Sequence, residues 1–127
     1  MEALRIEPTD DSPLVVLDRE NNLFEISGKS LPENVVQFYR PVTEWLTAYQ
    51  KDPGPETVFT FKLIYFNTAS SKMILDILML LEEMAEAGHE VTVRWMSLTS
   101  DEDMQEAGKE YEEMVDLPFE HHTYEFE

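Results

Sequence analysis

The chain has 127 residues, with 27 acidic and 9 basic side chains and no cysteine. A chain of this length buries an adequate core without disulfides, so we expect a single domain spanning residues 1–127. The formal net charge of −18 repels nucleic-acid phosphates and anionic lipids, which excludes nucleic acid and direct membrane binding as functions.

The N-terminal part of the chain predicts a β-hairpin. Residues 14–17 and 23–26 are short β-rich runs, and the polar segment 18–22 between them is typical of a turn. We expect Gly28 to close the second strand.

An amphipathic helix is predicted to follow. Ser30, Pro32 and Glu33 match a helix start in which serine is the cap. We expect Pro41 to kink this helix or to begin a second helical segment, and residues 52–55 to end it. The apolar stripe at helical spacing comprises Val35, Phe38, Tyr39, Val42, Trp45, Leu46 and Tyr49.

The middle of the chain predicts a strand–helix–strand unit. Residues 57–66 form an almost continuous apolar run, which favours a central strand covered on both faces. A strongly amphipathic helix is expected over residues 70–87, with Gly88 as its C-terminal stop. Alternation over residues 91–95 predicts the next strand, parallel to the first because a helix connects them.

The C-terminal part predicts a helix and an edge strand. The helix is expected over residues 101–115, opened by Ser100, and the strand over residues 122–126. The complete pattern indicates an α/β fold, one compact domain with helices packed on a mixed β-sheet. The expected inward side chains of this last helix are Met104, Ala107, Tyr111 and Met114.

The segment 67–72 is the best candidate for a functional site. It joins the central strand to the long helix, and three hydroxyl groups lie on this one turn, those of Thr68, Ser70 and Ser71. A helix N-terminus presents free N–H groups and favours an anion, such as a phosphate esterified to a side chain. Lys72 stands about one helical turn further on and would add a positive charge.

The same residues are also common helix caps. If Thr68 is the cap, Thr68→Ala should cost about 0.5–2 kcal/mol and leave the fold intact. A small-ligand or anion-binding domain without covalent modification is therefore the alternative function.

Five motifs in order resemble the SiaC-type family of bacterial regulatory phosphoproteins. The resemblance extends from about residue 10 to residue 120. It is carried by Leu63-Ile64-Tyr65-Phe66-Asn67-Thr68-Ala69-Ser70-Ser71-Lys72, Pro32-Glu33-Asn34, Trp45, Val91-Thr92-Val93-Arg94-Trp95 and Leu117-Pro118-Phe119-Glu120.

This resemblance implies a fold similar to the STAS-type anti-sigma-factor antagonists (SpoIIAA-like) and a partner-switching role. It implies that a protein kinase phosphorylates Thr68 and that a PP2C-type phosphatase reverses the modification. It also implies that the unmodified form activates a diguanylate cyclase in cyclic-di-GMP and biofilm signalling. Asn67 and Lys72 match the family, and Ala69, Ser70 and Ser71 complete the partner-binding segment, with Ser70 or Ser71 as alternative phosphorylation sites.

The remaining sequence indicates no enzyme, cofactor or metal site. His121 and His122 should point apart on a strand, and the acidic segment 101–103 lacks the glycine and spacing of a calcium loop. No nucleophile, base and orienting group can be assembled. Since no secretion signal or membrane span is apparent, we expect a cytoplasmic protein.

Overall fold

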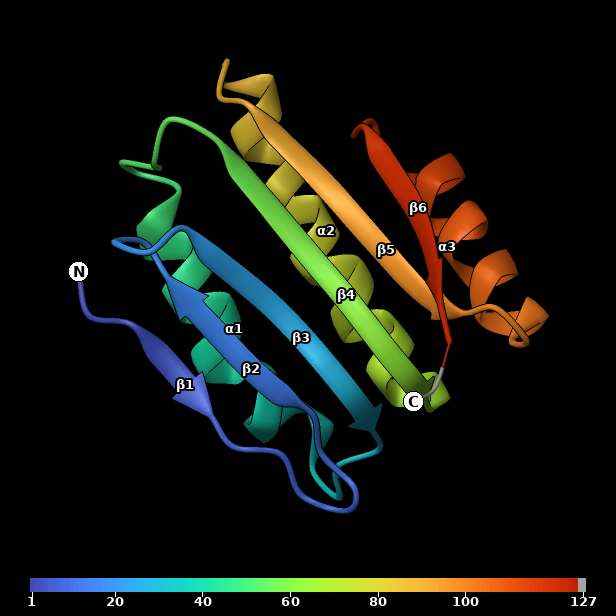
Figure 1. Cartoon of the computed structure of the whole chain (residues 1–127). Coiled ribbons are helices and arrows are strands. Elements are labelled where there is room, and N and C mark those ends of the chain that lie inside the picture. Colours follow the sequence, from blue (N-terminus) through green and yellow to red (C-terminus); the bar gives the residue numbers. More distant parts are fainter. Residues whose placement is uncertain (126–127) are drawn as a thin grey trace.

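A six-stranded mixed β-sheet forms the centre of the computed structural model, which describes residues 1–125 (Figure 1). The strands follow chain order across the sheet; β3 to β6 are parallel, whereas β2 is antiparallel to both β1 and β3. The elements are β1 (Leu4–Ile6), β2 (Leu14–Asp18), β3 (Leu23–Ser30), α1 (Val35–Tyr49), β4 (Thr57–Phe66), α2 (Thr68–Glu86), β5 (Val91–Leu98), α3 (Glu102–Met114) and β6 (Phe119–Tyr124). This confirms the predicted α/β class.

The N-terminal hairpin is confirmed, but its second strand is longer than predicted. β3 continues past Gly28 to Ser30, and the register with β4 shifts between Gly28 and Lys29. Gly28 has a φ of +103°, a conformation that glycine adopts without a Cβ penalty. Gly28 therefore marks an irregularity inside the strand and does not close it. The short strand β1 was not predicted, because three residues carry no periodic signal.

The predicted cap of the first helix is wrong. Ser30 is the buried last residue of β3, and the cap is Asn34, whose side chain accepts a hydrogen bond from the Gln37 N–H at 3.1 Å. α1 then continues through Pro41 as one helix, so no second helical segment begins there. Burial of its apolar stripe against the sheet outweighs the one hydrogen bond that proline removes.

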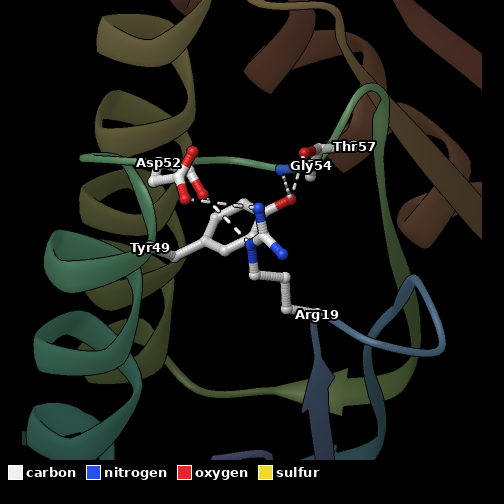
Figure 2. Close-up of polar contacts among 5 residues, drawn as sticks. All are labelled: Arg19, Tyr49, Asp52, Gly54 and Thr57. Carbon is white, nitrogen blue, oxygen red and sulfur yellow. Dashed lines mark hydrogen bonds and ion pairs between the residues drawn. The ribbon is translucent and has the colours of Figure 1, made fainter. Parts of the chain in front are cut away.

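A small polar cluster holds the connection between α1 and β4 in place (Figure 2). The buried Tyr49 hydroxyl accepts a hydrogen bond from the Gly54 N–H at 3.0 Å and shares another with the Thr57 hydroxyl at 2.7 Å. Arg19, in the turn that follows β2, donates to the Asp52 carbonyl at 3.1 Å. These contacts tie the loop to the start of β4 and to the turn between β2 and β3.

The central position of β4 is confirmed, but its expected cover on both faces is wrong. β4 lies between β3 and β5, and all three helices lie on the same face of the sheet (Figure 1). Phe59, Phe61 and Leu63 are buried beneath the helices, whereas Thr60 and Lys62 on the opposite face are only half-buried. An apolar run predicts that a strand is central; it does not predict how many layers the chain supplies.

The end of α2 is as predicted. Gly88 has a φ of +99°, and its N–H bonds the Ala85 carbonyl at 3.0 Å while the His89 N–H bonds the Met84 carbonyl at 3.1 Å. This pair of bonds is a Schellman motif, which satisfies the last carbonyls of the helix. None of the described helices, α2 included, is both long and apolar enough to span a bilayer.

Two details of α3 differ from the prediction. Asp101, rather than Ser100, caps the helix, since its carboxylate accepts a hydrogen bond from the Met104 N–H at 3.0 Å. Met114 was expected to face inward but is 60% exposed. It lies in the last turn, beyond Tyr111, where the helix borders a surface groove instead of the core.

The edge position of the last strand is confirmed. β6 begins three residues before the predicted strand and pairs with β5 in parallel over residues 119–124. Phe126, which the prediction placed in this strand, lies outside the described residues.

Candidate functional site

The segment 67–72 lies where β4 ends and α2 begins, at the carboxyl edge of the parallel strands (Figure 1). Asn67 caps the helix: its side-chain oxygen accepts from the Ser70 N–H at 2.8 Å, and its carbonyl accepts from the Ser71 N–H at 3.0 Å. Thr68 is therefore the first residue inside the helix and not its cap.

Thr68 presents its side chain to solvent at this helix start. Within residues 1–125, no hydrogen bond uses the N–H of Thr68 or of Ala69. Lys72 is exposed one turn further along and makes no ion pair with any described residue. An anion attached to Thr68 would meet two free N–H groups, the positive end of α2 and a nearby cation.

Ser70 occupies a different environment from Thr68. Its side chain is fully buried and donates a hydrogen bond to the Ser30 carbonyl at 2.9 Å, while the Ser30 hydroxyl donates to Ser70 Oγ at 2.8 Å. Tyr39 completes the chain, with its hydroxyl 2.5 Å from Ser30 Oγ. A phosphate on Ser70 would remove this donor and place a dianion in the core, so Ser70 is a poor phosphorylation site in this conformation.

Ser71 lies between these two extremes. It is half-buried, and its hydroxyl donates to the Thr68 carbonyl at 2.6 Å. Of the three hydroxyl groups in the segment, that of Thr68 is the most accessible to a modifying enzyme.

The buried network of Ser30, Tyr39 and Ser70 was missed by sequence analysis. It joins β3, α1 and α2 directly beneath the segment 67–72. In the sequence, Ser30 looked like a helix cap, Tyr39 like one member of an apolar stripe and Ser70 like the first residue of the long helix and an alternative phosphorylation site. No local pattern links them, because they are brought together only when the three elements pack.

Two substitutions separate the capping residue from the exposed one. We expect Asn67→Ala to lower the free energy of unfolding by about 1 kcal/mol, because the Ser70 N–H loses its acceptor. Thr68→Ala should change it by less than about 0.5 kcal/mol, as an exposed helix position. Urea denaturation of both variants checks this, and an equal or reversed order would contradict the capping assignment.

Two buried tyrosines flank the segment. Burial raises the pKa of Tyr39 to about 12 and the pKa of Tyr111 to about 12. The Tyr111 hydroxyl donates to the Ser71 carbonyl at 2.9 Å, which ties α3 to the start of α2. Both phenols are thus held neutral as hydrogen-bond donors.

These raised pKa values predict a loss of stability in alkali. A tyrosine whose pKa is higher in the folded than in the unfolded protein stabilises the fold while it is protonated. This stabilisation is complete below the unfolded pKa of about 10 and is lost as the pH rises toward 12. We expect the unfolding free energy to fall over this window, and to fall less steeply in Tyr39→Phe. Denaturant titrations at several pH values test this; an unchanged slope in Tyr39→Phe would contradict it.

A shallow groove of about 230 Å³ adjoins Thr68 between α2 and α3. Its lining includes Ser71 and Lys72, about one helical turn after Thr68, and the 60% exposed Met114. Tyr65, three residues before Thr68, is 52% exposed. The remaining lining residues are Phe66, Leu75, Ala107, Glu110 and Tyr111. An apolar, accessible surface of the kind that protein partners use therefore begins about one helical turn from Thr68.

The histidines on β6 are separated. His121 contacts Glu112 of α3 at 2.9 Å, whereas His122 contacts Glu120 at 3.1 Å. Within residues 1–125, no group of three or more histidine, aspartate or glutamate side chains is arranged to hold a metal ion.

Comparison with known proteins gives a consistent result. The sequence model described as "SiaC family regulatory phosphoprotein" matches residues 6–124. An uncharacterized protein of Pseudomonas aeruginosa is 31% identical over 119 residues, which cover 94% of each chain.

Solved structures agree with this match over almost the whole chain. The crystal structure of apo-SiaC from Pseudomonas aeruginosa is similar with a TM-score of 0.88 at 29% identity, covering 97% of this chain and 100% of that one. A chain from the crystal structure of the diguanylate cyclase SiaD in complex with its activator SiaC, from the same organism, gives a TM-score of 0.90 at 30% identity. It covers 95% of this chain and 99% of that one.

Proposed function

The chain belongs to the SiaC family of regulatory phosphoproteins, and from that membership we propose that it binds a protein partner under the control of phosphorylation at Thr68. In this proposal a protein kinase modifies Thr68, a PP2C-type phosphatase removes the phosphate, and the protein acts in the cytoplasm. The unmodified form binds and activates a diguanylate cyclase. The protein works by binding and not by catalysis.

The observation that carries the choice of Thr68 is its position at the start of α2. Its side chain is exposed, whereas Ser70 is buried and Ser71 is half-buried. The free N–H groups of Thr68 and Ala69, together with Lys72, favour the negative charge of a phosphate there. The fold therefore tolerates the modification without rearrangement.

The choice of a cyclase as partner is supported by a relative. The SiaC of Pseudomonas aeruginosa is described as the activator of the diguanylate cyclase SiaD, and its chain in that complex resembles this one over nearly its full length. The exposed groove beside Thr68 offers this chain a surface for such a partner.

The switch needs no large conformational change. A phosphate at Thr68 would place about two negative charges at the edge of the groove and inside any interface that covers it. Burying that dianion without a cationic partner is strongly unfavourable, so the modified form is released. Shifting a two-state equilibrium from 99:1 to 1:99 takes about 5.5 kcal/mol.

Mass spectrometry on the protein purified from its own cells tests this proposal. Intact-mass and fragment-ion measurements should find a phosphate on Thr68 that disappears after phosphatase treatment. Phosphate on Ser71 instead would keep the switch and move its site by three residues. Absence of phosphate under several growth conditions would contradict the proposal and favour an unmodified anion-binding domain.

A further inference from the structure

One face of the sheet is covered by no helix of the described chain, and only the end of β6 reaches over it, at one corner, where the Tyr124 ring lies against Lys62. The three helices pack on one side only (Figure 1), and no fully buried apolar side chain lies on the other. β3 to β6 are parallel, and parallel strands are normally covered on both faces. The half-buried side chains of this open face include Val16, Val58, Thr60, Ile64, Thr92, Met96 and Leu98.

The open face also differs from the rest of the molecule in charge. The three helices carry eleven acidic residues and only three basic ones. The six strands carry three acidic residues, Asp18, Glu25 and Glu120, against four basic ones, Arg5, Lys29, Lys62 and Arg94. A chain with a net charge of −18 thus has one broad surface that is close to neutral.

We propose that this open face binds the open face of a second copy of the chain. Two copies that approach through their helices repel each other, whereas their sheets bring no net negative charge together. A basic partner would instead be attracted to the acidic helices. The second copy is therefore the occupant that this distribution of charge favours.

The open face is self-complementary along its middle. One cross-strand row contains, in order, Arg5, Val16, Glu25, Thr60, Arg94 and Glu120. In this row the neutral β-branched residues Val16 and Thr60 lie among charges of both signs. A twofold axis that passes near Thr60 parallel to the strands would bring Glu25 of each copy towards Arg94 of the other, as an isologous interface requires.

The size of the face is sufficient. Six strands spaced about 4.8 Å apart, each about seven residues long at 3.3 Å per residue, give a face of roughly 550 Å². Two such faces bury roughly 1,100 Å², just above the value of about 1,000 Å² expected of a biological interface. The pairing would be a two-sheet sandwich whose inner faces lie about 10 Å apart.

Sedimentation of the protein alone tests the proposal. We expect a monomer–dimer equilibrium that shifts toward dimer at higher salt, since salt screens the repulsion between two acidic chains. Thr60→Glu adds a charge at the centre of the face and should weaken dimerisation by at least tenfold. Thr47→Glu, the same change on the exposed side of α1, should leave it unchanged.

A single-cysteine experiment gives an independent measurement, because the chain has no cysteine of its own. Thr60→Cys should form a disulfide-linked dimer on mild oxidation, and Thr47→Cys should not. This variant also keeps the proposal testable if Thr60→Glu fails to fold.

Two results would overturn the proposal. The first is a monomer at millimolar concentration in high salt; the second is cross-linking of Thr47→Cys as fast as Thr60→Cys. Binding of a cyclase to the open face of a monomeric protein would also overturn it, while leaving the switch at Thr68 intact. The inference does not depend on the proposed function, because each measurement uses this protein alone.

Discussion

Phosphorylation of Thr68 is expected to weaken binding to a diguanylate cyclase by about a thousandfold. Leaving a charge buried without a partner in an interface costs about 3–5 kcal/mol, and 1.4 kcal/mol corresponds to a factor of ten. Lys72 stands one helical turn away and is exposed, so it offsets only part of the charge. The fold itself is not disrupted, because the phosphate sits on the free N–H groups of the first turn of α2.

Isothermal titration of the purified cyclase measures this effect. The phosphorylated protein and Thr68→Glu are compared with the parent, and the glutamate should reproduce only part of the loss because it carries one charge and a different shape. Thr68→Ala should bind as the parent does. Thr47→Glu is the matched control, as it adds the same charge at an exposed site on α1.

Equal binding of the parent, the phosphorylated protein and Thr68→Glu would place the interface elsewhere on the molecule. Equal weakening by Thr68→Glu and Thr47→Glu would show a general effect of net charge. Either result would remove Thr68 as the switch.

Gly108→Ala is expected to lower the free energy of unfolding by about 2 kcal/mol. Gly108 is buried in α3, and a Cβ at this position would lie 2.4 Å from Cδ1 of Trp95. The indole cannot move away, since its Nε1 donates to the Met104 carbonyl at 2.9 Å and its ring packs against Phe61 and Tyr111. Overpacking of about 3 kcal/mol therefore outweighs the roughly 1 kcal/mol that alanine gains in helix propensity.

A double-mutant cycle in urea separates the two effects. In a Trp95→Leu background the ring is absent, so Gly108→Ala should become neutral or stabilising. Lys109→Ala, at the exposed neighbouring position, should change stability little. A stabilising effect of Gly108→Ala in the parent protein would mean that α3 can move away from the sheet and would contradict the close packing described here.

The sequence alone determined the order and type of most elements. Periodicity is local, so the apolar stripe of α1, the central strand β4 and the glycine stop at Gly88 were all recognisable. The motif around Thr68 indicated the family, which the match over residues 6–124 confirms. The role of Thr68 in switching stays a prediction.

Only the tertiary structure decided the remaining features. Ser30 looked like a helix cap but ends β3 and bonds Ser70, forty residues away in the chain. The absence of helices from the second face of the sheet could not be predicted either. An apolar run indicates that a strand is central, but it does not indicate how many layers cover that strand. Both depend on contacts between elements distant in sequence, and such contacts exist only once the helices have packed on the sheet.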